Sequence, residues 1–167
     1  MLEKNVEDQK VPKKTENMDA ENVEKLMNGL NDFGGIYSLN QLRHIKILSF
    51  PVSFVVLTYG HWISIYITND TVEIMDSAGY LNSENMHKSL KKFLRVHINH
   101  KKFTVTPKLQ SDESSSCALY ACVFIYYRTL TGKSLCDFCE IFTSDTSLNC
   151  TIIKELYSEI WKNQLTN

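Results

Sequence analysis

The segment that most constrains the fold is the run ALYACVFIYYRTL, residues 118–130, which is apolar on nearly every side. A helix of this kind has no polar face to turn toward water, so it must lie buried between other layers of structure. Gly132 follows the run and ends the helix. The chain has 167 residues, of which 43% are hydrophobic, and this is enough for one domain with a substantial core. We therefore expect a single domain built around this helix.

Patterns on both sides of the run predict the elements that bury it. β-branched and aromatic runs separated by Tyr59-Gly60 and Asn69-Asp70 are typical of short antiparallel strands. Apolar residues at spacings of three and four predict amphipathic helices. The expected strands lie at about 52–58, 61–67 and 71–76 and over the segment KKFTVT, and the other expected helices lie at about 20–31 after Asp19, from Ser83 onward, and at about 148–165.

This order of elements predicts an α+β fold. A mixed or antiparallel central sheet would pack against the buried helix, which carries Cys117 at its N-terminus, with further helices around it. Residues 1–18 are rich in Lys, Glu, Asp and Asn and hold few large apolar side chains, so they cannot repay the entropy of ordering. We expect a flexible arm over 1–18 and one domain over 19–167.

Charge and cysteine content indicate which partners and which cellular compartment to expect. The net charge of -1 argues against nonspecific electrostatic binding of nucleic acid. The chain has no long apolar run and no secretion signal at its start, so we expect a soluble intracellular protein, a monomer with no membrane contact. Its five cysteines are odd in number and confined to the C-terminal third, which favours reduced thiols. The one basic concentration is interpreted as a solvated face, with nucleic-acid contact as the alternative: Lys88, Lys91, Lys92, Arg95, Lys101 and Lys102.

Cys117 stands directly before the buried run and after the polar segment SDESSS. These polar residues can cap the helix, so the thiol is expected in its first turn, where free N–H groups and the helix dipole favour a thiolate. A cysteine taken alone is more often a core residue than a catalytic one. A nucleophile also needs a base and donors for the oxyanion, and these decide between the two interpretations.

His61 is the candidate base, because it alone of the five histidines opens a predicted strand. A two-residue hairpin turn between Thr68 and Thr71 would pair His61 with Ala78 and make Asp76 its diagonal neighbour, about 7–8 Å away between backbones. A carboxylate there can orient the imidazole and stabilise it when charged. Asp76 can also cap the turn DSAGY, and one carboxylate can do both. The histidines at 87, 97 and 100 are expected in solvent beside the lysine-rich helix.

Gln110 is the candidate oxyanion donor. It precedes Cys117 by seven residues, and its side-chain amide can donate beside the backbone N–H of Cys117 if the intervening loop folds back.

The other cysteines are expected to serve packing. Cys136 and Cys139 have the spacing of half a zinc or redox motif, but no second pair with suitable spacing follows, so we expect no metal site and keep a zinc-binding protein as an alternative. Cys122 is expected to pack in the core, and Cys150 to cap or pack the last helix.

Taken together, these residues resemble a known family. The segment GHWISIYI, then Asp76, then Gln110 with six residues between it and Cys117, is similar to the adenovirus-type, or adenain-like, maturation cysteine proteases. Their relatives occur in virophages and in virus-like transposons of the Polinton/Maverick type, and proteases that process ubiquitin-like modifiers are more distant relatives. The segment FGGIYSLNQL extends the resemblance, which spans roughly 33–127.

The resemblance implies a role for each residue. Cys117 would be the nucleophile, His61 the base, Asp76 its orienting partner, Gln110 and the backbone N–H of Cys117 the oxyanion donors, and Trp62 a wall of the substrate channel. The substrates implied are capsid and core precursors cut at Gly-containing sites during virion maturation, which would place the enzyme in the virion.

The sequence departs from the family in ways that bear on activity and regulation. Ala118 stands where the family usually has glycine, and its methyl group can crowd the oxyanion site. Adenovirus enzymes are activated by a peptide joined through a cysteine upstream of the nucleophile, and no cysteine precedes Cys117 here. Neither a peptide nor a DNA activator is required by the sequence. The alternatives to a maturation endopeptidase are a deubiquitinase-like or SUMO-type isopeptidase and a catalytically silent binding module with the same fold.

Overall fold

The protein is described from a computed structural model, which places residues 18–81 and 86–165. The described strands are β1 (Phe33–Ser38), β2 (Val52–Leu57), β3 (Trp62–Ile67), β4 (Thr71–Met75) and β5 (Lys102–Val105). The described helices are α1 (Ala20–Met27), the short 3-10 helix η1 (Leu42–His44), α2 (Lys88–His97), α3 (Cys117–Thr131), α4 (Leu135–Cys139) and α5 (Thr146–Leu165). The α+β fold class expected from the sequence is confirmed.

The strands form one mixed sheet in the order β1-β2-β3-β4-β5. The central strands β2, β3 and β4 run antiparallel, whereas β1 and β5 lie parallel to their neighbours at the two edges. In the β3–β4 hairpin Ser64 lies opposite Met75, and the N–H of Thr68 donates to the carbonyl of Thr71 at 2.9 Å. This is the two-residue turn, and the register, that the sequence predicts.

Strand β1 was not expected, because the sequence suggested only a break at Phe33-Gly34-Gly35. The two glycines allow an irregularity that brings β1 against β2. A Cβ on Gly34 would lie 2.5 Å from the ring of Phe54, and Gly35 has φ +122, in the left-handed region that glycine tolerates. A strand that begins with such a bulge has no regular alternation of apolar residues to reveal it.

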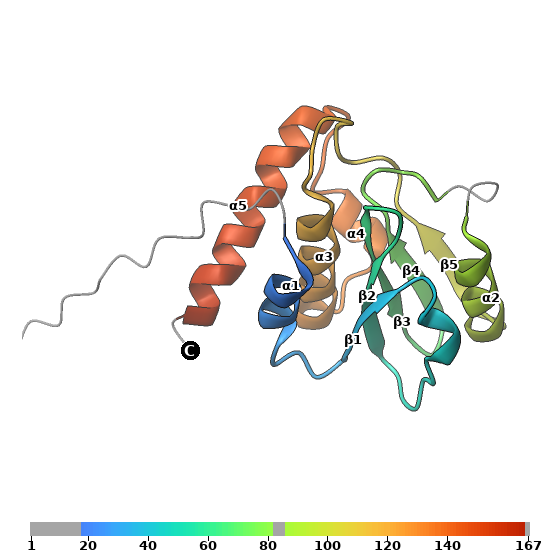
Figure 1. The fold of residues 1–167 in the computed structure, drawn as a ribbon. Coiled ribbons are helices and arrows are strands. Elements are labelled where there is room, and N and C mark those ends of the chain that lie inside the picture. The colour runs from blue at the N-terminus through green and yellow to red at the C-terminus, as the bar shows by residue number, and fades with distance from the viewer. Residues whose placement is uncertain (1–17, 82–85, 166–167) are drawn as a thin grey trace, which may run out of the picture.

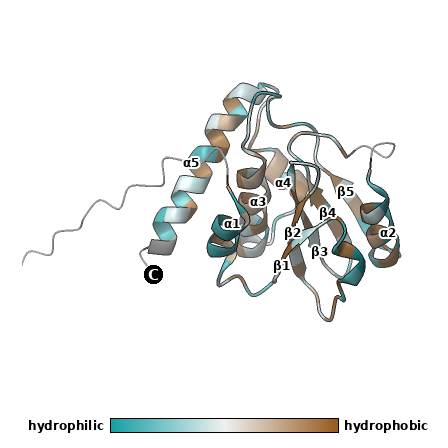
Figure 2. Ribbon diagram, in the orientation of Figure 1, coloured by the Kyte–Doolittle hydropathy of each residue, from teal (hydrophilic) through white to brown (hydrophobic). Residues whose placement is uncertain are grey.

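The sheet is covered on both faces. Helices α1, α3, α4 and α5 lie on one side, and α2 with η1 lies on the other (Figure 1). Helix α3 contacts β2, β3 and β4, and the residues from Cys117 to Tyr126 are buried. Figure 2 shows the hydrophobic colour concentrated in the strands between these layers. Burial on both faces explains why the strands are nearly continuous apolar runs in the sequence.

An ion pair fixes α3 to the sheet beneath it. The Arg128 Nε donates to Glu73 Oε2 at 2.8 Å, and the other oxygen of Glu73 accepts from the backbone N–H of Leu135 at 2.9 Å. Both side chains are largely buried. The pair therefore joins α3, β4 and the start of α4, and it holds the C-terminal half of α3 in register with the sheet.

The helix boundaries differ from expectation at two places. Asp19 caps α1 as expected, but the helix ends at Met27 rather than near residue 31, because the backbone leaves the helical conformation at Asn28 (ψ 130) and turns at Gly29 (φ +93). Helix α2 begins at Lys88, after the N-cap His87, and so later than the start expected at Ser83. Ser83 itself lies outside the described residues, and so do residues 1–17 of the expected arm. Met18, the last residue of that arm, is described and is buried. Within the described ranges, none of the helices has both the length and the apolar character needed to cross a bilayer.

Candidate active site

A cleft of about 360 Å³ opens where β3 begins and α3 begins. His61 stands directly before β3, Asp76 directly after β4, and Cys117 is the first residue of α3. His61, Trp62, Gln110 and Cys117 all line this cleft. The structure thus brings together residues that the sequence separates by up to 56 positions.

Asp76 holds the imidazole of His61 in a fixed orientation. The Asp76 Oδ1 lies 2.7 Å from His61 Nε2, and its Oδ2 accepts from the backbone N–H of Leu81 at 2.6 Å. The backbone N–H of Asp76 donates to the hydroxyl of Thr106 at 2.8 Å. Asp76 is fully buried, so each oxygen of the carboxylate is engaged and the group has little freedom to turn. The same carboxylate orients the histidine and caps the following turn, as the sequence suggested.

The sulfur of Cys117 lies among hydrogen-bond donors. The backbone N–H of Trp62 donates to Sγ at 3.5 Å. Burial of the thiol favours its neutral form, but hydrogen bonds from His61 and from the backbone of Trp62, with the charge of His61 and the backbone N–H of Ala118, lower the pKa of Cys117 below its ordinary value. A depressed pKa makes Cys117 a thiolate at lower pH than an ordinary cysteine.

The pKa of His61 shifts in the opposite direction, upward. Burial of the imidazole opposes its charge, but the hydrogen bonds to Asp76 and Cys117 outweigh burial and raise the pKa of His61 to about 9. The two shifts together favour the pair of an imidazolium and a thiolate over the pair of a neutral imidazole and a thiol. Because Nε2 is held by Asp76, the other ring nitrogen is the one left to exchange a proton with the sulfur.

The start of α3 lacks the side-chain cap that the sequence predicts. Ser116 occupies the N-cap position, but its side chain makes no capping bond and instead accepts from the hydroxyl of Ser114 at 2.9 Å. The N–H groups of a helix start have no partner within the helix. Because no side chain caps α3, the free N–H groups of its first turn lie at the cleft. There they favour negative charge on the sulfur and on a bound oxyanion.

Gln110 lies in the loop that leads into α3. Its side-chain Nε2 donates to the carbonyl of Ser114 at 2.9 Å, and its Oε1 accepts from the hydroxyl of Ser77 at 2.7 Å. One of the two amide hydrogens is occupied by Ser114, and Gln110 also lines the cleft beside Cys117. The loop therefore folds back as the hypothesis for Gln110 requires.

Trp62 lies at the boundary between two clefts. It lines the cleft of Cys117 and also a second one of about 390 Å³ between α1 and β1. Its side chain is half-buried and packs against the core on the α3 face. The position agrees with a wall between the nucleophile and the surface over which an extended chain would run.

The other cysteines are free thiols in different surroundings. Cys122 is fully buried, and burial raises its pKa; burial raises the pKa of Cys139 to about 11. Cys136 and Cys139 lie on the short helix α4, and Cys150 lies in α5. In the part of the chain that the structure describes, three or more His, Cys, Asp or Glu side chains are nowhere grouped to hold a metal ion.

Three residues at the site were not singled out by the sequence. Thr106 and Ser77 bond to Asp76 and Gln110 respectively, and the ring of Tyr80 packs edge-on against His61 with centroids 5.2 Å apart. Ser77 and Tyr80 follow Asp76 closely within DSAGY, so their nearness to the site could have been inferred from chain proximity. Thr106 follows β5 directly, and no local pattern points to it.

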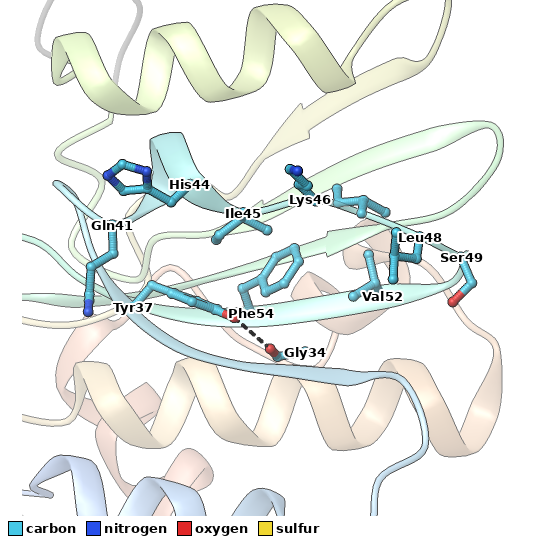
Figure 3. Close-up of a pocket in the computed structure, with 11 residues that line it drawn as sticks. Gly34, Tyr37, Gln41, His44, Ile45, Lys46, Leu48, Ser49, Val52 and Phe54 are labelled. Carbon is cyan, nitrogen blue, oxygen red and sulfur yellow. Dashed lines mark hydrogen bonds between the residues drawn. The ribbon is translucent and has the colours of Figure 1, made fainter.

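A larger cleft of about 520 Å³ lies elsewhere, between β1 and the segment 44–49 (Figure 3). Its walls are mostly apolar, with Tyr37 and Phe54 on the sheet side and the hydroxyl of Tyr37 bonded to the carbonyl of Gly34. It contains none of His61, Asp76, Gln110 and Cys117. Size alone would select the wrong cleft, so the chemistry of the lining places the candidate site at the smaller one.

Comparison with known proteins shows the family of this chain. The sequence model of the Ulp1 protease family, C-terminal catalytic domain, known as Peptidase_C48, matches residues 1–149. The chain belongs to this family. It is therefore a cysteine protease of the Ulp1 type, a broader group than the adenain-like enzymes that the sequence resembled. No curated protein sequence gives a significant match.

Solved structures share the fold at low sequence identity. The pS273R protease of ASFV matches with a TM-score of 0.60 and 16% identity, over 90% of this chain and 69% of that one. The central domain of the uncharacterized Lpg1148 protein of Legionella pneumophila matches with a TM-score of 0.50 and 11% identity, over 88% and 99% of the two chains. The effector Cdu1 of Chlamydia trachomatis, solved with bound ubiquitin, gives a TM-score of 0.45 and 17% identity over 64% and 48%.

Proposed function

We propose that this Ulp1-family protease is an endopeptidase whose nucleophile is Cys117. The sulfur attacks the scissile carbonyl and forms a thioester as the amine leaves, and water then hydrolyses the thioester. His61 gives its proton to the leaving amine and takes one from the attacking water. Asp76 orients the imidazole, while the Gln110 amide and the Cys117 backbone N–H donate to the oxyanion.

The observation that carries this proposal is the placement of the Asp76–His61 pair and of Cys117 together, where β3 and α3 begin. The carboxylate lies 2.7 Å from the imidazole, His61 and Cys117 line the same cleft, and the backbone N–H of Trp62, next to His61, donates to the sulfur at 3.5 Å. The opposite pKa shifts of His61 and Cys117 are the expected electrostatic result of that arrangement. A binding module with a silent site has no need of such a pair, so the geometry favours catalysis over that alternative.

For the substrate we propose capsid or core precursor proteins of a virus, cut at Gly-containing sites. Trp62, Tyr59 and Tyr80 line the cleft that holds Cys117, and these large rings would favour residues without a side chain next to the scissile bond. The fold shared with a viral protease, ASFV pS273R, is consistent with this setting. No cofactor is part of the proposal, and the enzyme would act as a monomer in the virion.

A second candidate is an isopeptidase for a ubiquitin-like modifier. The family match to the Ulp1 catalytic domain favours it. The chemistry at Cys117 would be the same, but such a substrate needs a broad docking surface in addition to the cleft.

The experiment that tests the proposal mixes the enzyme with a library of Gly-containing peptides and sequences the new chain ends. Cys117→Ala and Cys117→Ser serve as inactive variants, and Cys122→Ala is the matched control for loss of a buried thiol. We expect cleavage next to glycine by the wild type and by the control. Cleavage by Cys117→Ala at the wild-type rate would contradict the assignment. Parallel reactions with a capsid precursor and with modifier conjugates separate the two substrate classes.

A further inference from the structure

Ser77 links the two halves of the active site. It follows Asp76 directly in the chain, is buried with 1% of its surface exposed, and contacts the loop that carries Gln110 at three points. Its backbone carbonyl accepts from the N–H of Leu109 at 2.8 Å and from the N–H of Gln110 at 2.9 Å. Its hydroxyl donates to Gln110 Oε1 at 2.7 Å. Among the described residues, no other is hydrogen-bonded to both the backbone N–H and the side chain of Gln110.

The contacts of Gln110 leave its amide only one orientation. The carbonyl of Ser114 can only accept a hydrogen bond, so the group 2.9 Å from it must be the amide nitrogen. The amide oxygen then faces Ser77, and the serine hydroxyl can donate to it. One hydrogen of Nε2 is used by Ser114, and the second remains to donate to a substrate oxygen in the cleft that Gln110 lines.

We propose that Ser77 is a positioning residue, whose hydroxyl fixes the orientation of the Gln110 amide and so presents its free N–H to the oxyanion. This inference rests on the proposed function, in which Gln110 is the oxyanion donor. Without the hydroxyl, the buried oxygen of Gln110 loses its partner and the amide gains freedom to rotate away. Donors act in catalysis to the extent that they are held in place before charge develops. Ser77 is not a catalytic residue, because it acts only through Gln110.

The test is a double-mutant cycle with Ser77→Ala and Gln110→Ala, measured on the Gly-containing peptide that the wild type cleaves. The alanine keeps the backbone carbonyl, so only the hydroxyl is removed. We expect Ser77→Ala to lower kcat about five- to tenfold, the worth of one hydrogen bond, with KM unchanged because the oxyanion exists only in the transition state. Gln110→Ala should lower kcat about 100-fold, as removal of an oxyanion donor does elsewhere. In the Gln110→Ala background, Ser77→Ala should cost nothing further.

Ser53→Ala is the matched control. Ser53 is also a fully buried serine whose hydroxyl donates to a carbonyl, that of Asp32 at 3.2 Å, but it lies in β2 on no wall of the cleft. It should leave kcat within about twofold, as expected of a change with no contact to the site. If Ser77→Ala yields too little folded protein, Ser77→Cys, which keeps a weak donor, takes its place in the same cycle with a smaller expected loss.

The outcomes separate this inference from the proposed function. An unchanged kcat in Ser77→Ala, or an equal loss in both backgrounds, overturns the positioning role while the activity of Cys117 stands. An unchanged kcat in Gln110→Ala overturns the oxyanion assignment, and with it the reason for Ser77 to matter. Persistent cleavage by Cys117→Ala overturns the proposed function itself.

Discussion

The backbone N–H of Trp62 donates to the sulfur of Cys117 at 3.5 Å, and Trp62 is the residue directly after His61. Strand β3 therefore delivers two groups to the thiol from adjacent positions, an imidazole from one and a backbone donor from the next. Both lower the pKa of Cys117. Because the N–H belongs to the backbone, it persists whatever side chain stands at position 62, and this allows the side chain of Trp62 to be tested separately.

Trp62→Ala should change substrate selection without changing the thiol. We expect kcat/KM for the best Gly-containing peptide to fall about tenfold or more, since a large aromatic contact is lost, and the preference for glycine to relax as the entrance widens. The pH dependence of alkylation at Cys117 should match the wild type. Profiling both enzymes on one peptide library checks this; an unchanged preference in Trp62→Ala would mean that the side chain serves only the core.

The pH profile of kcat/KM should follow the pair of His61 and Cys117. Activity rises with pH as the thiol of Cys117 loses its proton, and this limb lies below the ordinary cysteine pKa. It falls again as His61 loses its proton, near its pKa of about 9. Steady-state rates over a range of buffers at constant ionic strength measure both limbs. A profile that still rises above pH 9 would be at odds with an imidazolium in the active form.

Asp76→Asn should narrow that profile from both sides. The hydrogen bond and charge of Asp76 raise the pKa of His61, so their weakening lowers the basic limb. With less imidazolium beside it, the thiol of Cys117 deprotonates at higher pH and the acid limb moves up. An asparagine amide nitrogen cannot accept from the N–H of Leu81, so this variant can be less stable than the wild type. The pH at which each limb lies does not depend on the fraction of folded enzyme, so it can still be compared. Limbs that stay in place would show that Asp76 does not tune the pair.

Arg128→Met should destabilise the fold by about 3 kcal/mol, because it leaves the carboxylate of Glu73 buried without its partner. The expected change is a lower midpoint of urea unfolding with an unchanged slope. Lys25→Met is the matched control: its partner Glu21 and the lysine itself are exposed, so loss of this pair should leave the urea midpoint almost unchanged. Equal losses of stability in Arg128→Met and Lys25→Met would show that the buried ion pair stabilises the fold no more than the exposed one.

Much of this arrangement could be predicted from the sequence, because the deciding contacts follow from local rules. The turn between Thr68 and Thr71 sets the β3–β4 register, and that register places Asp76 beside His61. The apolar run after Cys117 requires a buried helix, and the helix start is where the thiol lies. Gln110 could be named but not placed, since its position depends on the loop 111–116.

What escaped the sequence depends on contacts between distant segments. Thr106, directly after β5, and Ser77 act through hydrogen bonds that no hydrophobic periodicity indicates. Strand β1 is hidden by a glycine bulge that fits against Phe54. The uncapped start of α3 was also unforeseen, because Ser116 has the residue type of an N-cap but uses its hydroxyl for Ser114.

The most direct test of the account is the pH dependence of alkylation at each cysteine by iodoacetamide, followed by peptide mass spectrometry on the native protein. We expect Cys117 to react at mildly acidic pH, well before Cys136, Cys139 and the buried Cys122, and we expect His61→Ala to move this reaction to higher pH. If Cys117 instead titrates like an ordinary thiol, with the same curve in His61→Ala, the proposed pairing of sulfur and imidazole is wrong.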